Sequence, residues 1–442
     1  MSYSIEKITQ VVSAERYGDT AASISFLLTD SRSLCFPEET LFFALHTDRN
    51  DGHHYIPELY RRGVRNFVVE NVPNNFSDLY KHANFLKVGN TLAAFQQLAT
   101  FHRKAFNIPI VGITGSNGKT MVKEWLSQLF SYDMNVTRSP KSYNSQIGVP
   151  LSLWLLNENS QIGLIEAGIS KVGEMQALHD IIMPTVGVLT SIGTAHQENF
   201  SSLKEKCNEK LLLFKGTQAL IYRIDDKIAA NCVAETCYDG ELLAWSEHDT
   251  TAAFYVERIE KSNTTSTIHY IWKHSTHGNF ILPFIDDASI SNCITCAVVA
   301  LYFGMQPEVL AQRMAKLEPV AMRLEVKEGQ HGCTLINDSY NSDINSLNIA
   351  LDFMNRRPDQ KHRERTLILS DIYQSGETEE QLYAEVAVMV KERGIKKFIG
   401  VGKALNRQKQ AFGSLKDKFF FENTADFIES NVFKTLHNEV IL

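Results

Sequence analysis

The 442-residue sequence contains few cysteines, no long uncharged run and no excess of basic residues. Its 7 cysteines are an odd number spread along the chain, which excludes the disulfide framework of a small secreted protein. No uncharged stretch is long enough to span a bilayer, and Glu6 and Lys7 stand where a secretory signal has apolar residues. We therefore expect a cytoplasmic protein.

The charge balance excludes a second group of functions. The formal net charge is −7, which gives no electrostatic basis for binding nucleic acid or an anionic membrane. Hydrophobic residues make up 44% of the chain and charged residues 21%, as in ordinary globular proteins. The sequence shows no internal repeat and no low-complexity tract, and its length gives a prior of about three domains.

One pair of cysteines has a spacing that metal and redox sites use. Cys293 and Cys296 form a Cys-x-x-Cys pattern within the apolar segment that reaches Tyr302. Such a segment is typical of a packed helix, so we expect both thiols to be buried and structural.

The order of apolar runs predicts an α/β protein with three segments. Residues 1–104 alternate short strands with polar turns, which indicates a small α/β domain. Residues 105–314 begin with strands and helices typical of a doubly wound parallel sheet. Residues 315–442 alternate strands and helices again, which indicates a second Rossmann-like unit.

Two features refine this division. The segments Phe254–Ile259 and Thr267–Trp272 alternate apolar and polar residues, so they predict antiparallel hairpins in the second part of the central segment. Near the end of the chain, Asp426–Leu436 has the spacing of a single helix.

The run from Gly112 to Thr120 reads Gly-Ile-Thr-Gly-Ser-Asn-Gly-Lys-Thr and follows a short apolar stretch, Pro109–Val111. Apolar residues then recur at helical spacing from Val122 to Phe130, so the glycines lie on a strand-to-helix turn. Backbone N–H groups of such a turn bind phosphate oxygens beside the positive end of the helix dipole. A solvated glycine-rich turn is the alternative.

The residues of this turn have assigned roles in a phosphate site. Lys119 would reach the β and γ phosphates of ATP, and Thr120 would ligate Mg²⁺. Five residues separate Gly112 from Gly118, so the usual four-residue spacing is met only when Ile113 is the first position. The ATP-binding candidates of the turn are Gly115, Ser116, Asn117, Gly118, Lys119 and Thr120.

Two further polar residues follow predicted strands, where an open α/β sheet places its ligands. Glu166 ends the strand Ile162–Ile165, and His196 lies in the turn that follows the strand Val186–Leu189. A carboxylate at this edge can hold Mg²⁺ on the γ phosphate. Taken alone, Glu166 is more often a turn cap and His196 a satisfied loop histidine. Their common place beside a phosphate loop favours the functional interpretation.

The chain closely resembles the Mur ligases of peptidoglycan synthesis. The resemblance rests on the glycine run, on the stretch Ser142–Pro150, on Glu166-Ala167-Gly168, and on Ala195-His196 followed by Lys210. It implies three domains: an N-terminal one that binds a UDP substrate, a central ATPase-like one and a C-terminal Rossmann-like one. It also implies an ATP-dependent ligase that transfers the γ phosphoryl group to a carboxylate and lets an amine attack the acyl phosphate.

The resemblance further implies two Mg²⁺ ions. One would be held by Thr120 and Glu166, and the other by His196 and a carbamylated lysine. Lys210 matches that lysine by its place four residues before Phe214. Lys206, one helical turn earlier, is the competing assignment, and a solvated helix face is the alternative for both.

The ends of the chain resemble particular members of the family. The stretches Thr29–Arg32, Leu41–Leu45 and Asp51–His53 look like the uridine-nucleotide domain of members that act late in peptide addition. Arg323, Asp338–Asn341 and Ser346 look like the start of the C-terminal domain in the member that joins D-alanyl-D-alanine to a UDP-N-acetylmuramoyl-tripeptide. The resemblance assigns the UDP substrate to Ser31, Arg32, Asp51, Gly52, His53 and Asn144. It assigns ATP also to Asn292, Arg323 and Asp338, and the dipeptide to Tyr340, Asn341 and Ser346.

Several residues differ from the Mur ligase pattern, so alternative functions stay open. Ala288-Ser289 replaces the usual His-Asn pair, Met322 replaces a glycine, and the chain ends at Leu442 on a strand after which relatives continue. We therefore expect a truncated chain, cut from a fusion with alanine racemase. The alternatives are a Mur ligase that adds a single amino acid, a folylpolyglutamate synthetase-like ligase, and a non-catalytic nucleotide-binding module.

Overall fold

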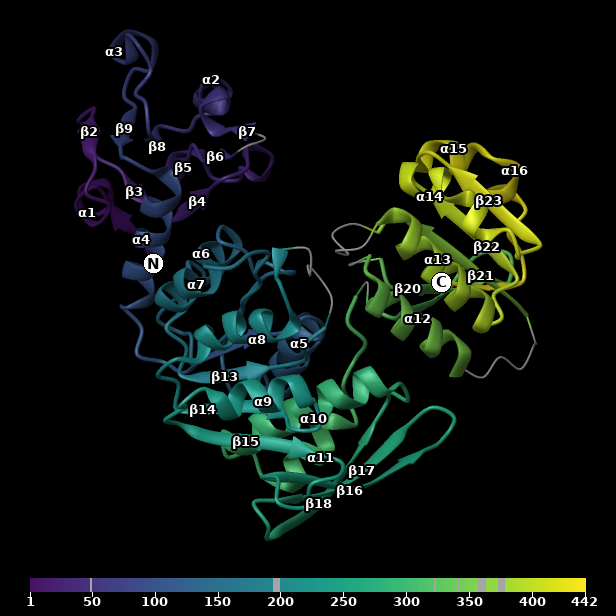
Figure 1. Ribbon diagram of the computed structural model, residues 1–442. Coiled ribbons are helices and arrows are strands. Elements are labelled where there is room, and N and C mark those ends of the chain that lie inside the picture. Colours follow the sequence, from purple (N-terminus) through teal and green to yellow (C-terminus); the bar gives the residue numbers. More distant parts are fainter. Residues whose placement is uncertain (48–49, 194–198, 322, 340–341, 357–362, 373–377) are drawn as a thin grey trace. The chain divides into compact units, whose positions relative to one another are not determined.

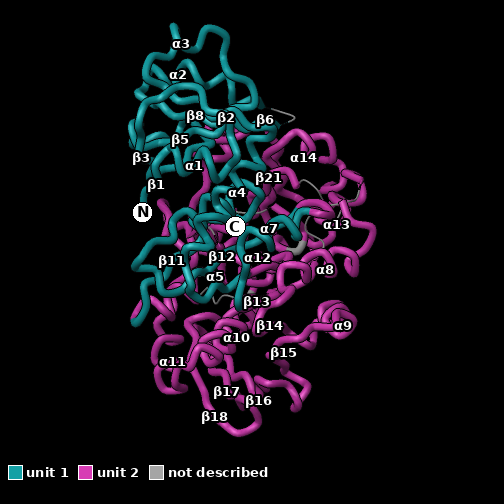
Figure 2. Tube along the Cα trace, turned by 90° about the vertical axis from the view of Figure 1, so that its left-hand side faces the viewer, with its two compact units in different colours: residues 1–112, 133–169, 174–185 teal, residues 113–132, 170–173, 186–442 magenta. Residues whose placement is uncertain are grey.

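The computed structural model describes residues 1–47, 50–193, 199–321, 323–339, 342–372 without 357–362, and 378–442 (Figure 1). It divides into two compact units, which are described separately. Unit 1 comprises Met1–Gly112, Asp133–Ile169 and Glu174–Thr185, and unit 2 comprises Ile113–Tyr132, Ser170–Gly173 and Val186–Leu442 (Figure 2). Over these residues, no helix is long and apolar enough to cross a membrane.

A five-stranded sheet forms the N-terminal part of unit 1. Its strand order is β2-β9-β8-β5-β4, with β2 antiparallel to β9 and the other neighbours parallel. The strands of this sheet are β2 (Glu15–Tyr17), β4 (Phe26–Leu28), β5 (Thr40–Phe43), β8 (Asn66–Val69) and β9 (Asn84–Lys87).

Apolar clusters cover both faces of this sheet, because successive residues of β5 point to opposite sides. Leu41 and Phe43 belong to one cluster, and Phe42 belongs to the other. The helices of unit 1 are α1 (Ile5–Val11), α2 (Ile56–Arg61), α3 (Phe76–Leu79), α4 (Thr91–Arg103), α6 (Gly148–Leu153) and α7 (Glu174–Ile182). Two short pairs, β1 (Tyr3–Ser4) with β3 (Ser23–Ile24) and β6 (His46–Thr47) with β7 (Asn50–Asp51), complete the strands before α4.

A nine-stranded sheet has the order β11-β12-β10-β13-β14-β15-β16-β17-β18. The pairs β13-β14, β14-β15 and β15-β16 are parallel, whereas β16-β17 and β17-β18 are antiparallel, so the predicted change to hairpins is confirmed. The strands are β10 (Ile110–Thr114), β11 (Val136–Arg138), β12 (Ile162–Glu166), β13 (Val186–Leu189), β14 (Ala219–Arg223), β15 (Glu241–Ser246), β16 (Phe254–Lys261), β17 (Ser266–Trp272) and β18 (Thr276–Leu282).

The helices of the central part of unit 2 are α5 (Lys119–Phe130), α8 (Leu203–Leu211), α9 (Lys227–Glu235), α10 (Asp287–Tyr302) and α11 (Pro307–Met314). Cys293 and Cys296 lie in α10 and have no exposed surface, and burial raises the pKa of both thiols. A thiol with a raised pKa is a poor nucleophile and a poor metal ligand at neutral pH. The predicted structural role of this pair is therefore supported.

A six-stranded sheet in the order β19-β20-β24-β21-β22-β23 forms the last part of unit 2. Its strands are β19 (Glu325–Glu328), β20 (Thr334–Asn337), β21 (Glu364–Ser370), β22 (Lys397–Val401), β23 (Asp417–Phe421) and β24 (Glu439–Ile441). Its helices are α12 (Ile344–Arg356), α13 (Glu379–Glu392), α14 (Lys403–Arg407), α15 (Thr424–Glu429) and α16 (Asn431–Lys434). The three larger sheets thus take their strands from residues 15–87, 110–282 and 325–441. The boundaries near 104 and 314 stay predictions.

The single helix predicted over Asp426–Leu436 is wrong. The chain forms α15 and then α16, with the extended residue Ser430 between them. The Ser430 side chain accepts a hydrogen bond from the Phe433 backbone N–H at 3.2 Å, so it caps the start of α16. A serine that caps a new helix competes with continuation of the preceding one.

Candidate active site

The turn between β10 and α5 has a conformation that only glycine adopts easily. Gly115 has φ 147° and Gly118 has φ 88°. An added Cβ would lie 2.0 Å from Thr190 Oγ1 at Gly115 and 2.4 Å from Asn292 Oδ1 at Gly118. Both glycines are therefore required by backbone conformation and by close packing.

The cradle is shorter than the sequence run suggested. Strand β10 continues to Thr114, so Gly112 lies inside a buried strand rather than in the turn. The turn proper is Gly115–Gly118, and α5 begins at Lys119. The predicted strand-turn-helix order is confirmed. Because Gly112 belongs to the strand, its five-residue separation from Gly118 does not describe the turn.

The segment after β13 holds this turn in place. Ser116 N–H donates to Ser191 O at 2.8 Å, and the N–H of Gly193 donates to Ser116 Oγ at 2.8 Å. Asn117 N–H donates to Ser191 Oγ at 3.3 Å. Sequence reasoning missed this role of Ser191 and Gly193, although the end of the strand at Leu189 was a signal that the next residues face the same edge.

Lysine side chains converge on the turn. Lys119 Nζ donates to Gly115 O at 2.7 Å and to Ser116 O at 3.1 Å, while Lys210 Nζ donates to Gly115 O at 3.2 Å. Lys206 Nζ donates to Gly193 O at 2.6 Å. The structure therefore brings Lys119, Lys206 and Lys210 together at the turn.

Burial changes the acidity of the two lysines on α8. Lys206 is 2% exposed and Lys210 3% exposed. Burial and then the charge of Lys119 lower the pKa of Lys206 to about 8. The same two causes, followed by the charge of Lys206, lower the pKa of Lys210 well below its ordinary value. A larger share of these amines is neutral, and hence nucleophilic, than for a solvated lysine.

The residues predicted to hold Mg²⁺ are described to different extents. Thr120 lies in the first turn of α5, and Glu166 ends β12 with no exposed surface, its N–H donating to Ser139 Oγ at 3.1 Å. A hydroxyl and a carboxylate are oxygen donors of the kind that Mg²⁺ prefers. His196 lies outside the described residues.

The second predicted metal site has a different donor set. Within the described part of the chain, no group of three or more His, Cys, Asp or Glu residues is placed to hold a metal. Lys210 as an amine supplies no metal ligand when protonated, whereas a carbamate on its Nζ would supply carboxylate oxygens. Thr120 and Glu166 thus have the donor types that Mg²⁺ prefers, and Lys210 would acquire them only by modification.

The predicted ATP contacts outside the turn lie on α10 and near β20. Asn292 packs against Gly118, and its Nδ2 lies 3.9 Å from Met121 Sδ. Asp338 Oδ1 accepts a hydrogen bond from Leu324 N–H at 3.2 Å. Burial raises the pKa of Asp338 to about 6, and the positive charge of Arg323 opposes that rise. The structure therefore brings Arg323 and Asp338 together.

In unit 1 the predicted UDP-binding residues bond to their own neighbours. The Arg32 guanidinium donates to both carboxylate oxygens of Asp30, and its side chain is 87% exposed. His53 Nδ1 lies 2.7 Å from Asp51 Oδ1, and His53 Nε2 accepts a hydrogen bond from Glu70 N–H at 3.1 Å. The proton of the neutral ring therefore lies on Nδ1, and Asp51 fixes the orientation of the imidazole.

The other predicted UDP-binding residues have close backbone contacts. Ser31 O accepts from the Arg62 guanidinium at 2.8 Å. Gly52 N–H donates to Leu45 O at 2.8 Å, and a Cβ at Gly52 would lie 2.7 Å from the Ala44 carbonyl carbon. Asn144 O accepts from Gly168 N–H at 2.8 Å, which brings Asn144 to the end of β12.

The predicted dipeptide residues are only partly described. Ser346 Oγ donates to Asp343 Oδ2 at 2.6 Å, and Ser346 N–H donates to Asp343 Oδ1 at 3.0 Å. These bonds are typical of the capped first turn of a helix, here α12. Tyr340, Asn341 and Met322 lie outside the described residues.

Parts of the chain are similar to known proteins. The model of the Mur ligase middle domain matches residues 113–300, the part that holds the turn, the lysines and α10. The UDP-N-acetylmuramoyl-tripeptide–D-alanyl-D-alanine ligase of Bacillus subtilis is 28% identical over 382 residues, covering 85% of this chain and 79% of that protein.

Solved structures resemble the whole chain. A crystal structure of MurF from Acinetobacter baumannii has a TM-score of 0.81 at 20% identity and covers 100% of this chain and 95% of its own. The MurF ligase from Thermotoga maritima in complex with ADP has a TM-score of 0.75 at 20% identity and covers 94% of this chain and 92% of its own. These structures share the fold, and together with the family model they confirm the α/β class. Residues 113–300 therefore match the Mur ligase middle domain, and the chain as a whole is similar to the ligases named above.

Proposed function

We propose that this enzyme joins D-alanyl-D-alanine to a UDP-N-acetylmuramoyl-tripeptide and converts ATP to ADP and phosphate. The observation that carries the proposal is the turn Gly115–Gly118 with Lys119, Lys206 and Lys210 bonded around it. The similarity to the Bacillus subtilis ligase over 85% of the chain supports the choice of substrates. ATP is the phosphoryl donor of the reaction.

The turn binds and orients the phosphates. The N-terminus of α5 would face the anion, and Lys119 would place its ammonium group at the γ phosphate. The terminal carboxylate of the tripeptide attacks the γ phosphorus and ADP leaves, which forms an acyl phosphate. The neutral amine of the dipeptide then attacks the acyl carbon to form the amide bond, phosphate leaves with the C–O bond electrons, and the nitrogen releases one proton.

Thr120 and Glu166 would hold the Mg²⁺ of this site. The ion, when bound, neutralises charge on the phosphate oxygens. The contribution of the chain is to keep these donors fixed: Thr120 in the first turn of α5, and Glu166 at the end of a buried strand.

Lys210 would be carbamylated and, with His196, would hold a second Mg²⁺. Its neutral amine adds to CO₂, a new N–C bond forms and a proton is released, which converts a cation into a carboxylate. The lowered pKa of Lys210 favours the neutral amine that this reaction needs. Lys206 has a lowered pKa as well and stays the competing assignment.

The remaining roles follow the family resemblance. Asn292, Arg323 and Asp338 would contact the nucleoside part of ATP. Ser31, Arg32, Asp51, Gly52, His53 and Asn144 would bind the UDP substrate, and Tyr340, Asn341 and Ser346 the dipeptide. A cytoplasmic location, a fused or associated alanine racemase, and domains spanning 1–104, 105–314 and 315–442 are part of the same proposal.

A coupled assay of ADP release tests the function. We expect ADP release only when ATP, a UDP-N-acetylmuramoyl-tripeptide and D-alanyl-D-alanine are all present, with lysine and diaminopimelate tripeptides compared. Release with a folate and glutamate would instead support the folylpolyglutamate synthetase-like alternative, and release with a single amino acid another Mur ligase. Nucleotide binding without turnover under every condition would support a non-catalytic module.

A further inference from the structure

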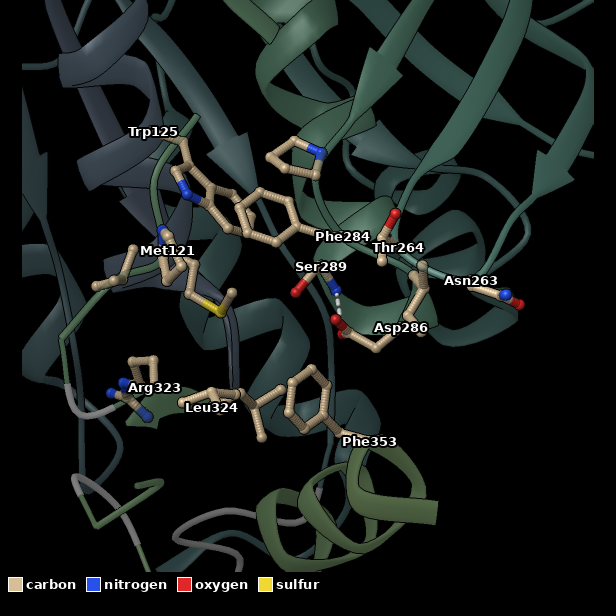
Figure 3. A pocket seen from close by; sticks show the side chains of 15 residues that line it. Met121, Trp125, Asn263, Thr264, Phe284, Asp286, Ser289, Arg323, Leu324 and Phe353 are labelled. Atoms are coloured by element: carbon tan, nitrogen blue, oxygen red, sulfur yellow. Dashed lines mark hydrogen bonds between the residues drawn. The ribbon is translucent and has the colours of Figure 1, made fainter. Parts of the chain in front are cut away.

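A cavity of about 600 Å³ lies in unit 2 beside α5 and the start of α10 (Figure 3). Met121, Trp125, Phe284 and Phe353 line it with apolar surface. The rings of Trp125 and Phe284 have centroids 4.9 Å apart and are tilted by 33°. Apolar and aromatic walls of this kind suit a flat heterocyclic ring.

Asp286 is the polar exception in this lining. It is the N-cap residue of α10 and is 4% exposed. Its Oδ1 accepts a hydrogen bond from Ser289 N–H at 2.8 Å, and among the described residues its Oδ2 is buried without a hydrogen-bond partner. Figure 3 shows the carboxylate on the side of the cavity that faces Met121 and Phe353. A buried acceptor in this state gains free energy when a ligand donates to it.

A continuous set of contacts links the cavity to the phosphate turn. Met121, which lines the cavity, lies two residues after Lys119 on α5 and approaches Asn292, which packs against Gly118. A ligand whose phosphates occupy the turn can therefore place its other end in the cavity. The part of ATP that is flat and apolar on its faces is the base.

The geometry points to Asp286 as the residue that selects the base of the nucleotide, by accepting a hydrogen bond from the exocyclic 6-amino group of adenine. This inference rests on the proposed use of ATP. One carboxylate oxygen is already bonded to Ser289, so the other suits a single N–H donor. Hypoxanthine and guanine carry a carbonyl oxygen at the same ring position. Because this oxygen and the carboxylate are both acceptors, these bases could not form the hydrogen bond.

The substitution Asp286→Asn tests this inference. Asparagine is also a good N-cap residue, so the variant keeps the start of α10 while an N–H donor replaces the acceptor. The measured quantity is the ratio of kcat/KM for ATP to kcat/KM for inosine triphosphate, which differs at the 6-position. We expect the unaltered enzyme to favour ATP at least about tenfold and the variant to lose about tenfold or more of that preference.

Asp287→Asn is the matched control. Asp287 is the next residue, its side chain is 66% exposed, and it forms an ion pair with Lys261. We expect this variant to keep the preference of the unaltered enzyme. Asp286→Ser is a second variant with a side chain that caps the helix but is too short to reach the base, and it should lose the preference as well.

The outcomes separate this inference from the proposed function. An unchanged ratio in a folded Asp286→Asn or Asp286→Ser variant overturns the role of Asp286 and leaves the ligase intact. Equal turnover of ATP and inosine triphosphate by the unaltered enzyme also overturns it. Failure of the unaltered enzyme to turn over either nucleotide with both substrates present contradicts the proposed function instead.

Discussion

The phosphate turn in unit 2 and the predicted UDP-binding residues in unit 1 differ in how their cations are held. At the turn, Lys119 and Lys210 donate to backbone carbonyl groups, which carry no net charge. In unit 1, Arg32 pairs with the carboxylate of Asp30. Lys119 lies in the proposed phosphate site, where charge changes during the reaction, whereas Arg32 is proposed to bind a part of the UDP substrate that takes no part in the chemistry. Substitutions at the turn should therefore have the larger effect on catalysis.

Lys119→Ala should have the largest effect. The variant removes the ammonium group beside the γ phosphate, and we expect turnover to fall about a thousandfold, which corresponds to about 4 kcal/mol. The measurement is ADP release at saturating substrates, with thermal unfolding as a check on the fold. Turnover within about threefold of the unaltered enzyme would remove Lys119 from the phosphate site.

Lys210→Ala should have the next largest effect, with a loss of about a hundredfold or more in kcat. Because the proposed carbamate acts as a carboxylate, acetate should partly restore the activity. Lys204→Ala on the same helix is the control, since the Lys204 side chain is 58% exposed and pairs with Glu235.

Intact mass under CO₂-replete conditions gives an independent readout for Lys210. We expect a labile mass increase corresponding to one CO₂ in the unaltered chain and none in Lys210→Ala. A bare Lys210 amine in a fully active, metal-loaded enzyme would reject this assignment and favour Lys206.

Arg32→Lys should have a smaller effect, confined to one substrate. Lysine keeps the charge but cannot copy the planar fork of a guanidinium, so we expect KM for the UDP substrate to rise about five- to tenfold with little change in kcat. Arg61→Lys is the control because Arg61 lies on α2 and donates to Pro57 O. An unchanged KM for the UDP substrate together with a raised KM for ATP would show that the N-terminal domain has been assigned to the wrong substrate.

The smallest effect at neutral pH concerns stability. His102 in unit 1 is 1% exposed, its Nε2 lies 3.0 Å from Leu156 O, and burial lowers its pKa to about 4. The unfolded chain binds this proton near pH 6.5, so stability present above that pH is lost as the pH falls toward 4. We expect the free energy of unfolding to fall by about 1–2 kcal/mol between pH 7 and pH 5 from this group.

His102→Gln should flatten that part of the pH dependence. Denaturant unfolding at several pH values, compared between the variant and the unaltered chain, measures the difference. Identical slopes for both chains would show that other groups account for the acid sensitivity.

Local patterns predicted the parts of the site that neighbours in sequence determine. The turn Gly115–Gly118 was predicted because strand, glycines and helix follow one another directly, and Lys210 was predicted from the family resemblance by its place four residues before Phe214. Each of these features is specified by residues within a few positions of it.

Long-range contacts account for what sequence reasoning missed. The bonds from Ser116 to Ser191 and Gly193 join residues more than 70 positions apart, and they exist only because β10 and β13 are neighbours in the sheet. The buried carboxylate of Asp286 depends in the same way on α5 and α10 enclosing one cavity. A pattern within one element cannot reveal which other element packs against it.

The most direct test of the central claim follows the oxygen atoms of the tripeptide. If the turn and its lysines transfer the γ phosphoryl group to the terminal carboxylate, a UDP-N-acetylmuramoyl-tripeptide labelled with ¹⁸O in that carboxylate must pass one labelled oxygen to the phosphate released with each turnover. The account predicts that inorganic phosphate recovered from the complete reaction carries this label. Unlabelled phosphate formed in step with the ligated product would contradict it.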